Sequence, residues 1–277
     1  MTRRISKPFL NALRLSLFFR IRIPTIAFCG LILFLASIAN SQTSTDPPAR
    51  IRLDDPAVDG SCLKPYKNVW KIVYSFPGKE PFLVGTWSDE LVAIELNGRH
   101  LMKRTQVADY AKYHVVTTNI NVFDPKNMAP VYDEFKQSGG ELVRRNFDNS
   151  SVTVQRLKAD ASTPEVKRLK LSEPVFDYYG GMYAVLLAAF PLREGYAATL
   201  PAIAENRDEL EMVTFTVRKE ELLDAGPGNQ VMAWPVDLDQ PDHDHLIFWI
   251  TKEPPYVIKL INIKPSAKWI TITISMM

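Results

Sequence analysis

Cysteine and histidine are scarce in this chain, and their scarcity argues against several classes of function. The 277 residues include two cysteines, Cys29 and Cys62, and four histidines. Cys29 falls in an N-terminal segment that we expect to be removed, which leaves Cys62 without an intramolecular disulfide partner. A secreted chain of this length can bury a large core without a disulfide. Cys62 is therefore interpreted as a bystander, with the thiol of a covalent dimer as the alternative.

The motifs that mark common catalytic sites are also missing. No Gly-x-Ser-x-Gly elbow is present, and the pair Gly180-Gly181 is not followed by the Lys-Ser/Thr of a phosphate-binding loop. Asp and Glu occur at so many positions that no particular pair of carboxylates can be identified as a catalytic pair. The sequence shows no fixed-length repeat and no low-complexity tract. We therefore expect a protein that is not an enzyme and has no cofactor.

The N-terminus has the composition of a signal peptide. Residues 1–22 hold six Lys+Arg and no acid, residues 23–39 are an apolar run, and small residues at Ala39 and Ser41 suit a signal peptidase. Seventeen apolar residues are short for a bilayer span, although an uncleaved anchor is the alternative. Cleavage after residue 41 predicts a periplasmic or secreted protein that contacts a membrane only through this segment.

Removal of that segment changes the charge balance. It leaves 27 Lys+Arg against 31 Asp+Glu, a net charge of −4, so the basic character of the whole chain belongs to residues 1–41. Nucleic-acid binding then loses its main electrostatic support. No nucleic-acid partner is expected.

The remainder divides into a linker and one folded domain. Residues 42–65 are rich in Thr, Asp and Pro and predict a flexible linker, whereas residues 66–277 are rich in short strand patterns that form one domain. Residues 82–87 and 91–96 are predicted as separate strands, and Asn97-Gly98 is a strong hairpin signal. Consecutive antiparallel strands with short turns predict a curved meander that tends toward closure.

One short helix interrupts these strands. Met182, Val185, Leu186 and Ala189 have the spacing of a buried helical stripe, and almost nothing polar lies between Met182 and Pro191. Asp177 is a candidate N-cap, but the two glycines at 180 and 181 move the expected start to about Met182. The predicted fold class is mainly β, a curved antiparallel meander or half-open barrel with one short central helix near residues 181–190.

Three segments resemble a known family. Residues 123–132 (Phe-Asp-Pro-Lys-Asn-Met-Ala-Pro-Val-Tyr), 190–196 (Phe-Pro-Leu-Arg-Glu-Gly-Tyr) and 248–257 (Phe-Trp-Ile-Thr-Lys-Glu-Pro-Pro-Tyr-Val) are similar to motifs of a family of uncharacterised secreted bacterial β-sheet proteins. The resemblance implies a half-open antiparallel barrel around a helix, similar to the fold of the periplasmic lipoprotein carriers. It implies no catalytic residues.

An apolar helix under a curved sheet suggests a site for a lipid or another hydrophobic ligand. The candidate ligand-binding residues are Tyr179, Met182, Tyr183, Leu186 and Trp249. Aromatic residues in such positions more often belong to a packed core, so the helix either fills the sheet or covers a cavity. A cell-envelope module that binds a protein partner is the alternative function.

A second alternative is a metal-dependent enzyme. Residues 242–245 read Asp-His-Asp-His, and His243 and His245 point to the same side of an extended segment. Zinc or copper accepts such a pair but needs one or two further ligands. A solvated hairpin tip explains the same residues, so they are weak candidates and no metal is predicted.

Overall fold

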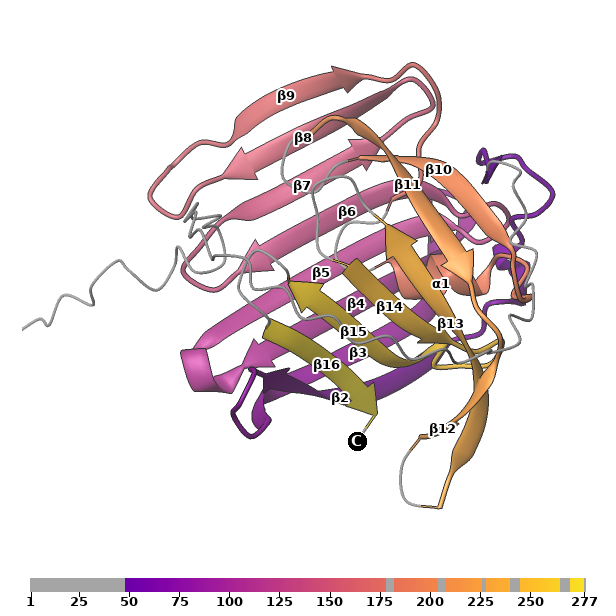
Figure 1. The fold of residues 1–277 in the computed structure, drawn as a ribbon. Helices are drawn as coiled ribbons and strands as arrows, with labels where there is room; N and C mark the ends of the chain where they lie inside the picture. Colours follow the sequence, from indigo (N-terminus) through magenta and orange to yellow (C-terminus); the bar gives the residue numbers. More distant parts are fainter. Residues whose placement is uncertain are drawn as a thin grey trace, which may run out of the picture.

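The chain folds into one large curved β-sheet around a short helix (Figure 1). The computed structural model describes residues 48–177, 182–203, 208–225, 228–239, 245–264 and 270–276. The first half of the chain contributes β1 (Ala49–Arg50), β2 (Tyr66–Ser75), β3 (Phe82–Leu96), β4 (Arg99–Tyr110), β5 (Val115–Asp124), β6 (Ala129–Gln137), β7 (Leu142–Phe147), β8 (Ser151–Leu157) and β9 (Glu165–Lys170). The second half contains β10 (Ala197–Ile203), β11 (Leu210–Val217), β12 (Glu221–Asp224), β13 (Gln230–Asp239), β14 (His245–Ile250), β15 (Val257–Lys264) and β16 (Ile270–Met276).

The sheet bends into two facing walls. Strands β2 to β9 follow one another as antiparallel neighbours and form the first wall, and β10, β11 and β13 to β16 form the second. The walls join where β16 pairs with β2, with Ile274 opposite Ile72. At the other side β9 pairs only with β8 among the described strands, so the sheet is not closed into a barrel. The predicted mainly-β, half-open antiparallel fold is confirmed.

Strand alternation decides which side chains face the interior. Along β11 the exposed and buried positions alternate, and Val213, Phe215 and Val217 face inward. The cross-strand partner of Phe215 is Leu238 on β13, which is also buried. Most inward-facing apolar residues of both walls belong to one large core cluster, and Val143, Val152, Val154, Val175 and Ile203 form a second, smaller cluster.

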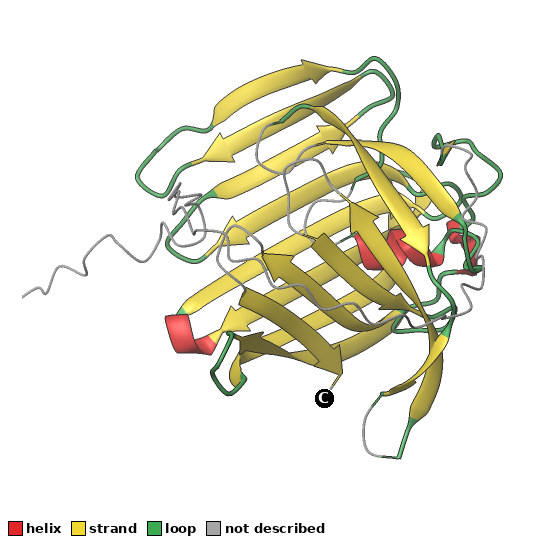
Figure 2. Ribbon diagram, in the orientation of Figure 1, coloured by secondary structure: helices red, strands yellow, loops and turns green. Residues whose placement is uncertain are grey.

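The helix α1 (Tyr183–Ala188) lies between the two walls (Figure 2). All six of its residues are buried, and Met182 is its N-cap, as the glycine pair in the sequence predicted. The candidate N-cap Asp177 does not cap the helix; instead, its Oδ2 accepts a hydrogen bond of 2.7 Å from Asn121 Nδ2. At the other end the Lys252 ammonium donates to the carbonyl oxygens of Ala188 and Phe190, which satisfies two acceptors after the last turn.

One prediction about the strands was wrong and one about a turn was right. The predicted strands 82–87 and 91–96 are one strand, β3, because Asp89 does not form a turn but stays in the ladder opposite Gln106. The Asn97-Gly98 hairpin is confirmed, with positive φ at both residues.

The predicted flexible linker 42–65 does not hold for residues 48–65. β1 pairs in parallel with β10, and Ile51, Leu53, Val58 and Leu63 are buried in the core cluster. The physical reason is that these apolar side chains recur among the prolines and aspartates of the segment. They cover the end of the sheet that lies beside the C-terminus of α1. A short 3-10 helix, η2 (Gly60–Cys62), and a second one, η3 (Ala111–Tyr113), complete the described elements.

No helix in the described residues has the length and apolar character needed to cross a membrane.

Candidate functional site

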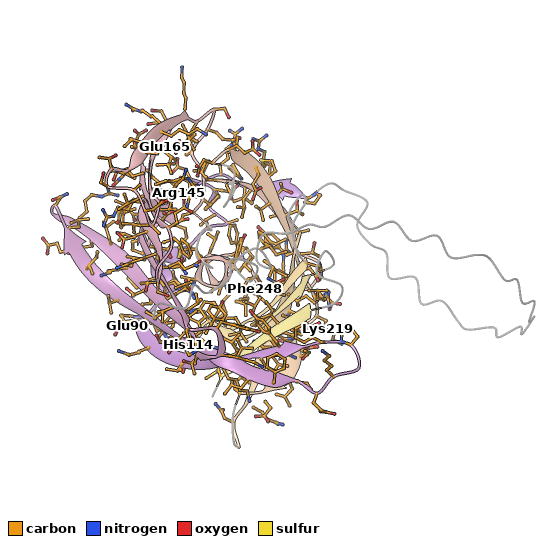
Figure 3. The ribbon with its side chains drawn as sticks, turned by 90° about the vertical axis from the view of Figure 1, so that its left-hand side faces the viewer. Glu90, His114, Arg145, Glu165, Lys219 and Phe248 are labelled. Atoms are coloured by element: carbon orange, nitrogen blue, oxygen red, sulfur yellow. The ribbon has the colours of Figure 1, made fainter. Side chains whose placement is uncertain are left out.

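The space between helix and sheet is filled by side chains. Met182, Tyr183 and Leu186 are all buried, and the rings of Tyr183 and Phe248 lie 5.6 Å apart. Figure 3 shows Phe248 between the two walls beside the helix. A cavity wide enough for an acyl chain would leave accessible surface on the residues of its wall, and these three side chains keep almost none. The described part of the helix therefore packs as core, while Tyr179 lies outside the described residues.

Trp249 faces the opposite side of the sheet from these helix residues. Its neighbours Phe248 and Ile250 point inward, so strand alternation turns Trp249 outward. There its Nε1 donates a hydrogen bond to Glu221 Oε1, and the Lys259 ammonium lies 4.5 Å from the ring centroid. The structure thus separates Trp249 from Met182, Tyr183 and Leu186.

The two candidate metal ligands do not form a described metal site. His243 lies outside the described residues, and His245 Nε2 lies 3.0 Å from Asp237 Oδ1. In the described segments no group of three or more His, Cys, Asp or Glu is arranged to hold a metal ion. The remaining cysteine, Cys62, is free and exposed.

At one end of the sheet, which we call the open end, apolar residues on the inner face are partly exposed. At this end β2, β4, β6 and β15 finish and β3, β5, β14 and β16 begin, on the side away from Lys252 and the C-terminus of α1. Several inward apolar residues there remain partly exposed although they pack on the core cluster: Tyr74, Phe82, Trp87, Ala108, Tyr110, Leu246 and Ile272. These residues come from both walls and line the inner face at this end.

Aromatic side chains surround the open end. Phe82 lies 6.3 Å from Tyr74 and is stacked on Phe76 at 5.9 Å, measured between ring centroids. The Lys112 ammonium lies 3.6 Å from the Phe82 ring centroid, within the range of a cation–π contact. Burial raises the pKa of the Tyr74 phenol, so this side chain is neutral near pH 7.

An apolar hollow lies beside this aromatic cluster. It has a volume of about 400 Å³ and is lined by Leu83, Val84, Gly85, Thr86, Asp109, Ala111 and Lys112. Leu83, on the wall of this hollow, is 60% exposed.

A row of polar residues crosses the interior deeper than the aromatic cluster. Asn68, Asp89, Gln106 and Asn119 are consecutive cross-strand partners on β2, β3, β4 and β5. Asp89 accepts hydrogen bonds from the fully buried Arg104 and, at 2.8 Å, from Tyr66 OH.

Burial disfavours the charge on Arg104, but Asp89 outweighs burial and holds the pKa of Arg104 above its ordinary value. The ion pair of Arg104 and Asp89 therefore needs no further charged partner. The amides are different, because Asn68 Nδ2 and Asn119 Oδ1 are buried without a hydrogen-bond partner among the described residues.

A second polar cluster joins the two walls. Arg145 on β7 lies 3.4 Å from Asp133 and 3.2 Å from Asp208, measured between guanidinium nitrogens and carboxylate oxygens. Arg156 on β8 also pairs with Asp208 at 2.7 Å. Burial, and then the negative charge of Asp177, raises the pKa of Asp133 well above its ordinary value. Burial acts in the same direction on Asp208, but the two arginines outweigh it and hold its pKa low.

Sequence reasoning missed both polar groups and the open end. The signal was the polar residues at alternate positions of otherwise apolar strands, such as Asn119 and Asn121 on β5 and Asp133 on β6. Strand register is needed to show that these residues share one face and meet across strands.

Comparison with known proteins gives a single family. The model of a protein of unknown function, DUF3108, matches residues 104–267, which begin in β4 and end beyond β15. No curated protein and no solved structure gave a significant match.

Proposed function

The chain belongs to the DUF3108 family, and we propose that it is a non-enzymatic protein that binds a lipid or another hydrophobic molecule at the open end of its curved sheet. The observation that carries this proposal is the partial exposure of inward apolar residues, Trp87, Tyr110 and Leu246 among them, on both walls. Apolar side chains that face the concave side of a sheet are normally covered. A hydrophobic ligand would provide that cover.

The size of the driving force is adequate for such a ligand. Burial of an acyl chain contributes about 0.8 kcal/mol per methylene, so roughly 14 carbons supply on the order of 10 kcal/mol before the costs of ordering. The ligand enters next to α1 rather than beneath it, because Met182, Tyr183 and Leu186 are packed as core.

A pair of variants on one strand tests the site. Ala108 faces inward at the open end, and its neighbour Val107 faces outward between Ser88 and Thr118. We expect Ala108→Trp to weaken binding of an uncharged fluorescent lipid probe at least tenfold and Val107→Trp to leave it unchanged. Mass spectrometry of solvent extracts from the purified protein identifies any lipid that copurifies. Absence of both copurified lipid and probe binding in the wild type would reject the proposal.

We further propose that the protein is exported and acts in the periplasm or outside the cell. The support is the composition of residues 1–41, with its basic start, apolar run and small residues at Ala39 and Ser41. The mass of the protein purified from its native compartment tests this, since cleavage after Ser41 leaves a chain that begins at Gln42. An intact N-terminus would favour an anchor.

A cell-envelope module that binds a protein partner is the second candidate. The observation that favours it is β9, an exposed strand that pairs only with β8 in the described part of the sheet. A free edge can accept a strand from a partner, although its lysines also discourage such pairing. Crosslinking followed by pull-down separates the two functions, because a stoichiometric protein partner favours this one and bound lipid favours the first.

A further inference from the structure

Three asparagines face the interior of the curved sheet with one amide atom each that has no hydrogen-bond partner in the described part of the chain. Asn68 and Asn119 lie on the first wall, and Asn262 lies on the second wall, opposite Leu246 on β14 and Ile272 on β16. Asn68 Nδ2, Asn119 Oδ1 and Asn262 Oδ1 are buried and have no hydrogen-bond partner among the described residues. A buried polar atom without a partner costs about 1–3 kcal/mol, so three on one inner surface need an explanation.

The charges on the same surface are already neutralised. Arg104 donates from Nε to both carboxylate oxygens of Asp89, and Arg145 lies within ion-pair distance of Asp133 and Asp208. Among the described inward residues near the open end, no cation is left over for an incoming anion. A carboxylate or phosphate moved into this interior would be buried without a counter-charge, which is far more costly than burial of a neutral polar group.

We propose that the ligand is a neutral amphipath, with an apolar chain and an uncharged polar group such as an ester, a hydroxyl or an amide. This inference rests on the proposed function and specifies the ligand of the same site. The apolar chain lies against the aromatic residues of the open end, including Tyr74, Phe82 and Trp87. The uncharged group reaches one of the asparagine amides: a carbonyl oxygen accepts from Asn68 Nδ2, whereas a hydroxyl or an amide N–H donates to Asn119 Oδ1 or Asn262 Oδ1.

An anionic amphipath has one other place for its head group, and the structure identifies it. The Lys112 ammonium lies at the edge of the open end over the Phe82 ring. A fatty acid could bind with its carboxylate at Lys112 and its chain inward. Binding with the head group outward would make affinity depend on Lys112 and leave the asparagines without a role.

The experiment compares ligands of one chain length on the full chain: 1-lauroylglycerol, lauramide and laurate, titrated by intrinsic tryptophan fluorescence at pH 7.5. We expect both neutral ligands to bind at least tenfold more tightly than laurate. Asn119→Leu and Asn262→Leu should each reduce that preference about fivefold or more, because the site then lacks the partner for the polar group. Asn146→Leu on the exposed face of β7 is the matched control and should change nothing.

Each outcome distinguishes failure of the neutral ligand class from failure of the proposed function. Equal affinities, or tighter binding of laurate that Lys112→Ala abolishes, would overturn the neutral ligand class and keep the site. Failure of all three ligands to bind would instead remove the proposed function. The variants are expected to fold, because replacing an unpartnered buried amide by a similar apolar group is neutral or stabilising. Circular dichroism and the melting temperature check this directly.

Discussion

Arg145 on β7 and Asp208, two residues before the start of β11, form a buried ion pair between the two walls, with Nη2 and Oδ1 3.2 Å apart. Arg156 on β8 reaches the same carboxylate. The two strands β7 and β11 are far apart in the sheet order, so this contact does not follow from strand pairing. The contact connects the second wall to the first wall on the side where strand pairing does not close the sheet.

Removal of the Asp208 charge should therefore destabilise the fold. Asp208→Asn leaves the fully buried Arg145 and the partly buried Arg156 without their shared anion, and breaking a buried ion pair costs about 3–5 kcal/mol. Asparagine tolerates the positive φ at this position, so the change isolates the charge. Denaturant unfolding at pH 7 measures the effect. Glu90→Gln is the control, because its exposed pair with Lys67 should contribute less than about 1 kcal/mol.

The same aspartate predicts a dependence of stability on acid. Because the pKa of Asp208 is lower in the folded protein, its contribution is present above the ordinary carboxyl pKa and is lost as the pH falls below it. The difference in stability between wild type and Asp208→Asn should shrink on acidification from pH 6 toward pH 3. A difference that stays constant would show that the carboxylate charge is not the source of the stabilisation.

Asp133 should behave in the opposite sense. Its pKa is raised in the folded protein, so as the pH rises above about 4 the unfolded chain loses this proton before the folded chain does. Stability from this group therefore falls as the pH rises toward its folded pKa. Asp133→Asn should match the wild type near pH 4 and gain relative stability by pH 8, measured as the melting temperature. A variant that loses relative stability over this range would contradict the raised pKa.

A cavity made in the helix should affect stability but not ligand binding. Leu186→Ala removes a buried side chain from the core cluster and should cost about 2–5 kcal/mol. If Leu186 instead lined a ligand pocket, truncation would cost less stability and would change probe affinity. Leu222→Ala on the exposed β12 is the control, expected within about 0.5 kcal/mol of the wild type.

The packed segment before β2 gives a further test. A Cβ atom at Gly60 would lie 2.4 Å from the carbonyl oxygen of Pro125 and 2.5 Å from Met128 Sδ, so Gly60→Ala must displace the segment or the β5–β6 turn. We expect a loss of about 1–3 kcal/mol, the range found for overpacked sites. Cys62→Ala, at an exposed position two residues later, should be nearly neutral. If Gly60→Ala were also neutral, residues 48–65 would not be docked.

Local patterns were sufficient for the helix and for the hairpin. The stripe of Met182, Val185 and Leu186 together with Pro191 predicted α1 to within a residue or two of its start, and Asn97-Gly98 predicted the turn between β3 and β4. These signals depend on neighbouring residues alone. The break predicted between residues 87 and 91 failed because Asp89 is stabilised by Arg104, a partner 15 residues away.

The sequence by itself determined the mainly-β class, the position of the helix, and the apolar character that forces that helix into the interior. Only the tertiary structure decided that the helix is packed as core at its described residues, that Trp249 faces away from it, and that partly exposed apolar residues gather at one end of the sheet. The reason is physical: periodicity assigns a side chain to a face, but which faces meet depends on strand register and on how the sheet bends. The interior asparagines and the Arg145–Asp208 pair exist only once both walls are in place.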